Sequence, residues 1–311
     1  MFDQIFKHNI IDLLPEVRGK YKKNEPMKKH TWFGVGGPAE VMFIPEDKED
    51  LSNFIRKRPQ NLPLYVIGGG SNLLVRDGGI PGIVIKLDSP QFKQYKIEGN
   101  SITCGGGMKN IDLQKIMINN KIGGLEFLSS IPGSIGGSVR TNAGCYGKEV
   151  KDVIIKAEII NDEGEIKEVP VEDLMLSYRN SYFPEDWIIT AITFKVYPDS
   201  PEHILSIINE QKNKRQKSQP HNVRTAGSTF KNPEGLKAWE LIKKSGCDKL
   251  KVGGAEVSDK HCNFLINTGT ASAQDIEDLG ESIRARVKEA TAITLEWEIK
   301  RIGINKRDAD E

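Results

Sequence analysis

The chain has 311 residues and carries 44 Lys plus Arg against 43 Asp plus Glu, so its net charge is close to zero. A balanced charge argues against a global attraction to nucleic acid or to an anionic membrane, although a local basic pocket for a small anion remains open. A hydrophobic fraction of 38% and a mean hydropathy of −0.43 are ordinary for a soluble protein of two or three domains.

Targeting and metal signals are absent from the sequence. No apolar run approaches the roughly 20 residues of a spanning helix, so we expect no membrane insertion. The first 26 residues lack the unbroken apolar core of a signal peptide, which favours a cytoplasmic protein. The cysteines form no C-x-x-C pair, so we expect no metal site and reduced thiols; they are Cys104, Cys145, Cys247 and Cys262.

The first third of the chain reads as a lead-in followed by a small α/β unit. Residues 1–29 look helical and then charged, and the unit spans 30–88. The runs VMFIP, PLYVIGGG and GIVIKL predict buried strands, and residues 46–58 predict a helix with Leu51, Phe54 and Ile55 on its apolar face.

A second unit is expected over residues 89–199. Residues 95–107 predict a hairpin that turns at Gly99–Asn100, and 110–120 predict a helix closed by Gly123–Gly124. Another hairpin at 153–170 and a strand at 187–197 follow the glycine-rich stretch 128–147.

A third unit is expected over residues 200–303, before a charged tail at 304–311. Helices are predicted at 203–217 and 236–246, with Gly246 as C′ cap, and a strand at 263–268. Ser272 and Asp275 resemble a capping box that opens a further helix, whose apolar stripe is Ile276, Leu279, Ile283 and Val287. In the last strand, 292–303, the side chains at 293–300 alternate: one face has Ile293, Leu295, Trp297 and Ile299, and the other has Thr294, Glu296, Glu298 and Lys300.

Two glycine loops predict a ligand. They are VIGGGSNLLV (66–75) and SSIPGSIGGSVRTNAGCYG (129–147), the second too glycine-rich for a helix or a strand. Main chain without side chains can point successive N–H groups at phosphate oxygens, which favours a dinucleotide or pyrophosphate over plain structural turns. The Walker, Rossmann and hydrolase-elbow patterns all fail when they are matched against these loops.

Polar groups outside the loops have two interpretations each. Arg179, beside Tyr178 and just before a strand, could bind a carboxylate or phosphate, or form a surface salt bridge. Glu298 shares its strand face with Glu296 and Lys300, and by itself this pattern is more typical of a solvated face than of a site. The basic run 211–217 is more typical of a charged helix end than of a phosphate grip.

Ser228, in AGSTFKNP, has no evident histidine base, because neither His221 nor His261 can be chosen from the sequence. A serine hydroxyl can instead deliver a proton to a carbanion or enolate as it forms, with Lys231 and Asn232 holding the substrate. Such an anion could come from hydride addition to an electron-poor double bond, with a flavin in the glycine loops as donor.

Five motifs in this order resemble the UDP-N-acetylenolpyruvoylglucosamine reductase family, the UDP-N-acetylmuramate dehydrogenases of peptidoglycan precursor synthesis. They are IGGGSNLLVRDGGIPGIVI, IPGSIGGSVRTNAGCYG, YRNSYF, AGSTFKNP and LEWEIKRIG, preceded by HTWFGVGGPAE at 30–40. The resemblance covers nearly the whole chain.

The resemblance implies an α+β fold. Two subdomains of the vanillyl-alcohol-oxidase-like (PCMH) type would hold noncovalent FAD, and a C-terminal α/β domain would bind substrate. NADPH would reduce the flavin, and the enolpyruvyl ether of UDP-N-acetylglucosamine would then take the hydride at its methylene carbon. The partners are thus small molecules, with no nucleic acid.

The resemblance also implies site residues. Arg179 and Glu298 would act at the substrate carboxylate, Glu298 with a raised pKa, and Ser228 would protonate the adjacent carbon; Glu296 is the alternative glutamate. The cofactor-binding residues would be Gly68, Gly69, Gly70, Ser71, Asn72, Leu73, Ser130, Pro132, Gly133, Ser134, Gly136, Gly137, Asn142, Ala143 and Gly144. The substrate-binding residues would be Tyr178, Lys231, Asn232, Arg215, Gln219, Arg224 and His261.

Two departures from the family pattern matter. Gly34 stands where a basic residue commonly follows HT-x-F, and the stretch between Arg179 and Ser228 is too short for the tyrosine-bearing loop of one subclass. The chain thus resembles the shorter-loop subclass, and Arg215, Gln219 and Arg224 are its candidates for the diphosphate.

Three other functions remain as alternatives: an FAD-dependent sugar or lactone oxidase of the same fold, a noncatalytic nucleotide-binding regulator, and a serine hydrolase. The motifs AGSTFKNP and LEWE argue against the oxidase, and the presence of Arg179, Ser228 and Glu298 argues against the regulator. The sequence leaves the oligomeric state open, a monomer included.

Overall fold

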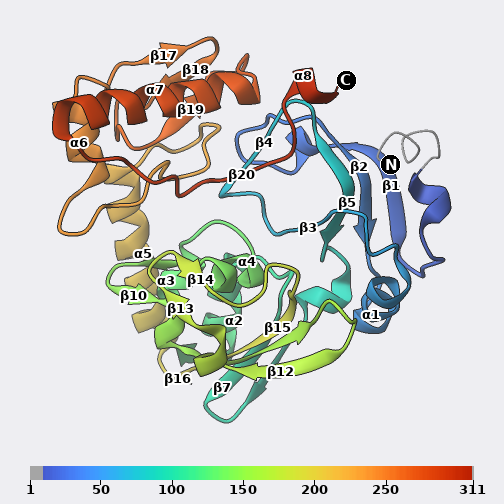
Figure 1. Cartoon of the computed structure of the whole chain (residues 1–311). Coiled ribbons are helices and arrows are strands. Elements are labelled where there is room, and N and C mark those ends of the chain that lie inside the picture. The colour runs from blue at the N-terminus through green and yellow to red at the C-terminus, as the bar shows by residue number, and fades with distance from the viewer. Residues whose placement is uncertain (1–9, 310–311) are drawn as a thin grey trace. The chain divides into compact units, whose positions relative to one another are not determined.

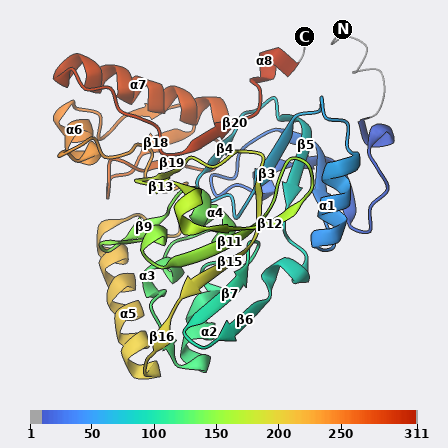
Figure 2. The ribbon, with the colours of Figure 1, turned by 60° about the horizontal axis from the view of Figure 1, so that its bottom comes forward.

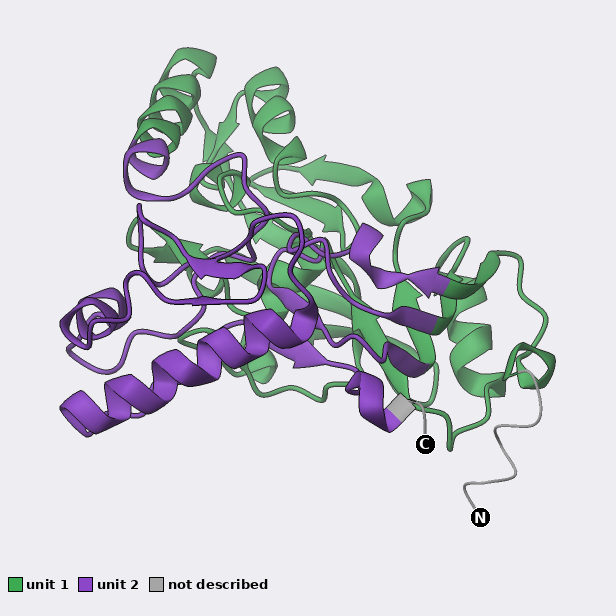
Figure 3. Cartoon of the chain, turned by 90° about the horizontal axis from the view of Figure 1, so that it is seen from above, with its two compact units in different colours: residues 1–24, 40–69, 82–213 green, residues 25–39, 70–81, 214–311 purple. Residues whose placement is uncertain are grey.

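The computed structural model describes residues 10–309, which form two compact units (Figure 1, Figure 3). Unit 1 comprises residues 1–24, 40–69 and 82–213, and unit 2 comprises 25–39, 70–81 and 214–311. The predicted boundaries at 29/30, 88/89, 199/200 and 303/304 stay predictions. No helix in the described part of the chain is both long and apolar enough to cross a bilayer.

A four-stranded sheet, most of whose residues belong to unit 1, has the order β1-β2-β5-β3. Its strands are β1 (Lys20–Pro26), β2 (Pro38–Ile44), β3 (Leu64–Ile67) and β5 (Ile80–Lys86), with α1 at Lys48–Lys57. The predicted apolar face of α1 is confirmed, because Leu51, Phe54 and Ile55 are buried in one cluster with strand residues.

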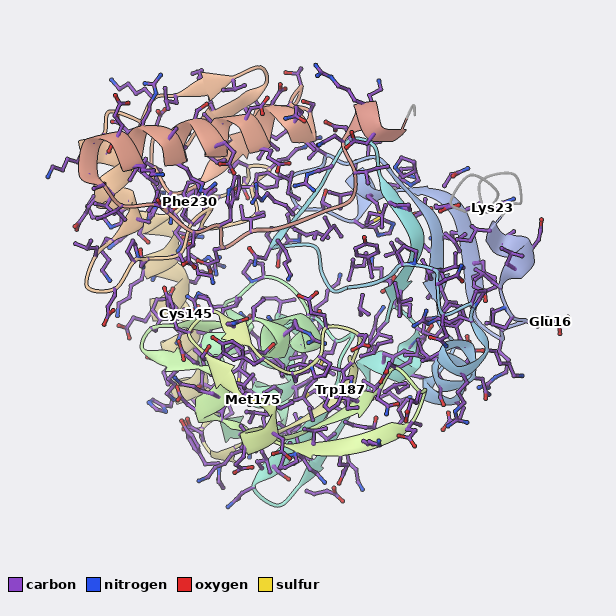
Figure 4. The ribbon with its side chains drawn as sticks, viewed as in Figure 1. Glu16, Lys23, Cys145, Met175, Trp187 and Phe230 are labelled. Atoms are coloured by element: carbon purple, nitrogen blue, oxygen red, sulfur yellow. The ribbon has the colours of Figure 1, made fainter. Side chains whose placement is uncertain are left out.

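The charged part of the predicted lead-in contains a strand, an element that was not predicted there. A 3-10 helix, η2, covers Ile10–Leu13, but the charged run is strand β1 at the edge of the sheet. Lysines such as Lys23, labelled in Figure 4, suit an exposed edge strand because they discourage pairing with another chain. Residues 1–9 lie outside the described residues.

The second sheet of unit 1 is antiparallel, in the order β12-β11-β15-β7-β6. Its strands are β6 (Tyr95–Glu98), β7 (Ser101–Gly105), β11 (Ile154–Ile160), β12 (Ile166–Pro170) and β15 (Ile188–Lys195). Both predicted hairpins are confirmed. The helices are α2 (Asp112–Asn120), α3 (Glu126–Ser129), α4 (Ile135–Arg140) and α5 (Pro201–Ser218), and Figure 2 shows α5 beside α3.

Two local predictions in this unit are wrong. Helix α2 ends at Lys121, which takes the left-handed conformation with φ of 54°, and not at Gly123–Gly124. The stretch 129–147 contains α4, because Ser134 caps the helix by accepting from the Gly137 N–H and thereby offsets the low helix propensity of two glycines.

Short elements complete unit 1. The two-stranded pairs are β8 (Ile122–Gly123) with β16 (Tyr197–Pro198), β9 (Gly144–Cys145) with β10 (Lys148–Glu149), and β13 (Leu176–Ser177) with β14 (Asn180–Ser181). Further 3-10 helices are η3 (Met27–Lys29), in unit 2, and η4 (Pro90–Lys93), η5 (Val150–Asp152) and η6 (Val171–Leu174), in unit 1.

Unit 2 packs helices on a three-stranded sheet of order β17-β18-β19. The elements are β17 (Lys251–Val252), β18 (Ala255–Val257), β19 (Leu265–Asn267), α6 (Ala238–Lys244), α7 (Ala273–Thr291) and α8 (Lys306–Ala309). The capping box of Ser272 and Asp275 is confirmed, and the predicted stripe of α7 is fully buried.

The predicted last strand is only partly regular. β20 (Lys300–Ile302) pairs in parallel with β4 (Leu73–Val75), while residues 292–299 form no strand and Trp297 makes an isolated bridge with Phe230. The predicted alternation is confirmed all the same: Leu295 and Ile299 are buried, and Glu296 and Lys300 are exposed.

Candidate active site

Two glycine loops of unit 1 lie against each other. A Cβ at Gly68 would come within 2.4 Å of the Ser134 hydroxyl oxygen, and a Cβ at Gly69 within 2.8 Å of the Gly133 Cα. Contacts this close leave no room for a side chain, so the loops pack main chain to main chain. The sequence predicted each loop separately, and the structure brings them together.

A third glycine run, Gly105–Gly107, supports the second loop. The Gly136 N–H donates to the Gly106 carbonyl at 2.9 Å, and the Ile135 N–H donates to the Met108 carbonyl at 2.9 Å. The sequence analysis missed this role. The signal that could have shown it is a triple glycine at a strand end, the same pattern as Gly68–Gly70.

Asn142 ties the second loop to other parts of unit 1. Its Nδ2 donates to the Ser177 carbonyl at 2.8 Å and to Glu149 Oε2 at 3.0 Å, and its Oδ1 accepts from the Lys151 N–H. The residue is completely buried. Its side chain therefore works as an internal link in this structure, and its contact with a cofactor stays a prediction.

Ser130 and Ala143, which were predicted to contact the cofactor, make hydrogen bonds within the loop. The Ser130 hydroxyl donates to the Phe127 carbonyl at 2.8 Å, and the Ala143 N–H donates to the Ser138 carbonyl at 2.8 Å. Pro132 and Gly144 both keep part of their surface exposed.

The rest of the first loop, Gly70 to Leu73, belongs to unit 2. Gly70 has φ of 68°, and a Cβ there would lie 1.8 Å from the His30 carbonyl oxygen, so only glycine fits this turn. Ser71 and Asn72 are half-buried, and Leu73 begins β4. The Asn72 Nδ2 donates to the Glu298 carbonyl at 3.0 Å, which joins this loop to the strand that carries a predicted catalytic residue.

The glycine loops of unit 1 fit a flavin dinucleotide. Main chain rather than side chains lines the meeting point of 68–69 and 133–137, and Gly69, Gly136 and Gly137 keep part of their surface exposed. Exposed main chain that carries no side chains suits the close approach of a planar ring and a pyrophosphate. These loops therefore suit FAD.

Tyr178 and Arg179 form the turn of the β13–β14 hairpin, in which Ser177 pairs with Asn180. Arg179 has φ of 54°, a left-handed conformation that costs a non-glycine residue about 1 kcal/mol or more. Its Nη2 donates to the Gly144 carbonyl at 3.0 Å, and Tyr178 is 47% exposed. The turn thus presents an arginine and a tyrosine from a strained, well-connected position.

Ser228 and Glu298 lie on neighbouring extended segments of unit 2. The Glu298 N–H donates to the Thr229 carbonyl at 2.8 Å, and the Lys231 N–H donates to the Glu296 carbonyl at 2.9 Å. The Asn263 side chain holds Phe230 from the other side, accepting from its N–H and donating to its carbonyl. This pairing sets the register of the two predicted catalytic residues.

The two glutamates of LEWE differ in their surroundings. The Glu296 side chain is 76% exposed and lies 3.5 Å from the Lys231 Nζ. Glu298 is only half-exposed, and its main chain is bonded to both Thr229 and Asn72. Glu298 is thus the less exposed and the more tightly held of the two, and its role at a ligand stays a prediction.

Ser228 lacks the surroundings of a nucleophile. Within residues 10–309, its hydroxyl has no histidine hydrogen-bond partner. His261, in the same unit, instead accepts from the Asn263 N–H through Nδ1 and packs edge-on against Phe264. Burial lowers the pKa of His261. A serine hydrolase therefore finds no support in this arrangement.

The other predicted substrate residues are spread over unit 2. The Asn232 Oδ1 accepts from the Ala238 N–H, so this side chain shapes the turn before α6. Arg215 is half-buried, and the Gln219 N–H donates to its carbonyl. Arg224 is exposed, and a Cβ at Gly34 would lie 3.3 Å from its Cδ, so the missing side chain at 34 leaves room for Arg224.

The comparisons with known proteins agree on one family. A model described as an FAD binding domain matches residues 39–170, and a model of the UDP-N-acetylenolpyruvoylglucosamine reductase C-terminal domain matches 219–302. UDP-N-acetylenolpyruvoylglucosamine reductase of Parvibaculum lavamentivorans is 48% identical over 96% of both chains. The enzyme of the same name from Rickettsia conorii is 46% identical over 94% of this chain and 98% of its own.

A solved structure confirms the predicted fold. The UDP-N-acetylenolpyruvylglucosamine reductase of Thermus caldophilus superposes with a TM-score of 0.80 at 34% identity, over 93% of this chain and 100% of that one. The α+β prediction, with an FAD-binding module and a separate C-terminal domain, is thereby confirmed. The chain belongs to the UDP-N-acetylenolpyruvoylglucosamine reductase family and contains its FAD-binding domain.

Proposed function

We propose that the chain reduces the enolpyruvyl ether of UDP-N-acetylglucosamine to UDP-N-acetylmuramate, with NADPH as electron donor, as a cytoplasmic step in peptidoglycan precursor synthesis. The single observation that carries the proposal is the pairing of the Ser228 segment with the Glu298 strand in unit 2. A serine without a histidine partner, on a segment whose main chain pairs with that of residues 296–298, suits protonation of a carbanion better than nucleophilic attack.

FAD, when bound, supplies a hydride to the methylene carbon of the double bond. The electron pair of the broken π bond then resides on the neighbouring carbon and the carboxylate attached to it. Arg179 stabilises that growing negative charge, since a guanidinium binds a carboxylate through two parallel hydrogen bonds. Ser228 delivers a proton to the neighbouring carbon, and water or Glu298 restores its hydroxyl.

Glu298 acts at the substrate carboxylate. A neutral carboxyl group there would donate a hydrogen bond, whereas an ionised one would repel the substrate. Tyr178, Lys231, Asn232 and His261 are further substrate contacts of this proposal, and Arg215, Gln219 and Arg224 are its candidates for the diphosphate.

The test is an anaerobic absorbance experiment on the purified protein. We expect a flavin band that NADPH bleaches and that the enolpyruvyl ether restores. Restoration by oxygen alone would support a sugar or lactone oxidase of the same fold instead. A colourless protein that takes up no FAD would overturn the proposal and favour a nucleotide-binding regulator.

A further inference from the structure

Arg140, the last residue of α4, holds the segment that follows the Arg179 turn. Its Nη1 donates to the carbonyls of Phe183, at 3.1 Å, and Pro184, at 2.8 Å. Its Nη2 donates to the carbonyls of Glu185, at 3.5 Å, and Trp187, the latter labelled in Figure 4. The guanidinium carbon also lies 3.9 Å from the centre of the Phe183 ring. One planar cation thus collects four main-chain carbonyls of a single loop.

The Arg140 side chain is half-buried. Burial lowers the pKa of Arg140 to about 10, although the charges of Glu185 and Asp186 oppose the shift. A buried cation is retained only where its donors are well satisfied, and the four carbonyls satisfy them here. Lysine could not reproduce this arrangement, because its ammonium group lacks the flat fork of five N–H donors.

Residues 140–144 hold the hairpin itself from the same side. The Ser181 hydroxyl donates to the Arg140 carbonyl at 2.7 Å. The Asn142 Nδ2 donates to the Ser177 carbonyl at 2.8 Å, and the Arg179 Nη2 donates to the Gly144 carbonyl at 3.0 Å. The end of the second glycine loop therefore contacts the residue before the turn, the turn and the residue after it.

The hairpin needs this support. Non-glycine residues in the left-handed conformation lie in and near it: Arg179 (φ 54°) in the turn, Met175 (φ 44°) just before β13, and Asn142 (φ 41°), which donates to the Ser177 carbonyl. Within the hairpin Tyr178 is 47% exposed and the other residues are half-buried. Strained residues persist only where the surroundings fix them, and they gather at functional sites.

We infer that Arg140 is a positioning residue. It fixes the turn that carries Arg179 to α4, the helix that begins in the second glycine loop. The inference rests on the proposed function, since it takes Arg179 as the group that binds the substrate carboxylate. The second glycine loop and the turn that carries Arg179 are then held by the same helix, α4. Weakening the hydrogen bonds of Arg140 would therefore weaken carboxylate binding selectively.

The experiment compares two ligands on the FAD-loaded protein. UDP-N-acetylmuramate carries the lactyl carboxylate and UDP-N-acetylglucosamine lacks it, so the ratio of their dissociation constants isolates carboxylate recognition. For Arg140→Lys we expect binding of UDP-N-acetylmuramate to weaken about 10- to 100-fold, the penalty of a displaced positioning group. Binding of UDP-N-acetylglucosamine and flavin reduction by NADPH should stay within about twofold of the parent.

Arg56→Lys is the control. Arg56, in α1, also donates to a main-chain carbonyl, that of Gly164, through its Nη2 at 3.0 Å. Both residues lie outside the hairpin, the glycine loops and the segment 183–187. We expect this variant to keep the ligand ratio of the parent. Equal loss of both ligands in both variants would mean that Arg140 serves stability alone, and would overturn the inference.

Two further variants keep the result decisive. If Arg140→Lys does not fold, Ser181→Ala is used in its place, because it removes the hydrogen bond from the Ser181 hydroxyl to the Arg140 carbonyl. We expect binding of UDP-N-acetylmuramate to weaken selectively by about fivefold. An unchanged ratio of the two dissociation constants would overturn the inference. Arg179→Lys tests the proposed function separately. An unchanged ratio of dissociation constants in Arg179→Lys would contradict the role of Arg179 itself. A changed ratio in Arg179→Lys together with an unchanged ratio in Arg140→Lys would contradict only the present inference.

Discussion

At the scale of single residues, the polar side chains differ in whether hydrogen bonds within the protein already occupy them. The side chains of Asn142 and Asn263 are buried and occupied by hydrogen bonds within the protein. Ser228 is half-exposed on a segment that is paired on both sides through its main chain. A half-exposed serine on a fixed main chain is suited to deliver a proton to a bound ligand.

Ser228→Ala should separate the two half-reactions. Flavin reduction by NADPH does not need the hydroxyl and should stay nearly intact. Reoxidation by the enolpyruvyl substrate should slow by about 10²- to 10⁴-fold, the usual contribution of a general acid. Stopped-flow absorbance measures both steps, and Ser218→Ala, on the exposed end of α5, is the control. Equal loss in both steps would show that Ser228 has a structural role.

Glu298→Gln and Glu296→Gln should differ sharply. Glutamine keeps the shape and a hydrogen-bond donor but cannot take or release a proton. We expect substrate-dependent reoxidation to slow about 100-fold in Glu298→Gln and to change less than about twofold in Glu296→Gln. The reverse order in single-turnover rates would make Glu296 the functional residue.

At the scale of elements, close main-chain contacts determine where glycine is required. The loops 68–69 and 133–134 touch without side chains, and Gly280 in the middle of α7 lies under the Trp297 ring. Glycine lowers helix stability by about 1 kcal/mol relative to alanine, so its presence inside a helix needs a packing reason. The Trp297 ring supplies that reason, and Trp297 is the residue before Glu298.

Gly69→Ala should lower FAD retention more than it lowers stability. The new Cβ would lie 2.8 Å from the Gly133 Cα and would push the two loops apart. We expect about 1–3 kcal/mol lower unfolding free energy and a clear drop in the flavin-to-protein absorbance ratio. Gly99→Ala, at an open hairpin turn with φ of 56°, is the control and should lose stability without losing FAD. Full FAD occupancy in Gly69→Ala would contradict the loop assignment.

Gly280→Ala should disturb the site from within α7. A Cβ there would meet the Trp297 ring at 2.2 Å, and Trp297 is held by its Nε1–H donating to Glu281 Oε1 at 2.8 Å. Moving the ring moves the Glu298 strand, so substrate-dependent reoxidation should fall about 10-fold or more despite the better helix propensity of alanine. Unchanged kinetics with raised thermal stability would show that the ring can adapt.

At the scale of the whole molecule, the chain forms two units with separate hydrophobic cores, and each unit carries part of the proposed machinery. Arg179, Gly68, Gly69 and the second glycine loop lie in unit 1, and Gly70 to Leu73, Ser228 and Glu298 lie in unit 2. Unit 2 also contains an ionic network. Arg76 binds Glu277 through Nε and Nη2 at 2.9 Å each, and Arg301 bridges Glu277 and Glu281.

The network predicts loss of stability in acid. The hydrogen bonds from Arg76 hold the pKa of Glu277 below its ordinary value of 4.5. A carboxyl group with a lowered folded pKa stabilises the fold above its unfolded pKa, and this contribution disappears as the pH falls through the folded value. Glu277→Gln should lower the free energy of unfolding by about 2 kcal/mol at pH 7 and by much less near pH 3. Urea titrations at both pH values measure the difference, and a pH-independent loss would contradict the ionic explanation.

Local patterns in the sequence determined most of the elements. The apolar stripes of α1 and α7, the capping box at Ser272 and the parity of residues 293–299 are all confirmed, because hydrophobic period and capping chemistry act within a few residues. The motifs also identified the family and its FAD. Tertiary context overrode local patterns elsewhere, as when an available sheet edge made the charged run 20–26 into β1.

Only the tertiary structure decided which residues meet. Glycine runs at 68–69, 105–107 and 133–136 are far apart in sequence and come together through main-chain contacts that leave no local pattern. The same holds for the pairing of the Ser228 segment with the Glu298 strand, and for the hold of Arg140 on residues 183–187. Sequence encodes the period and chemistry of each segment, whereas long-range register depends on how the cores pack, and packing is a property of the folded chain.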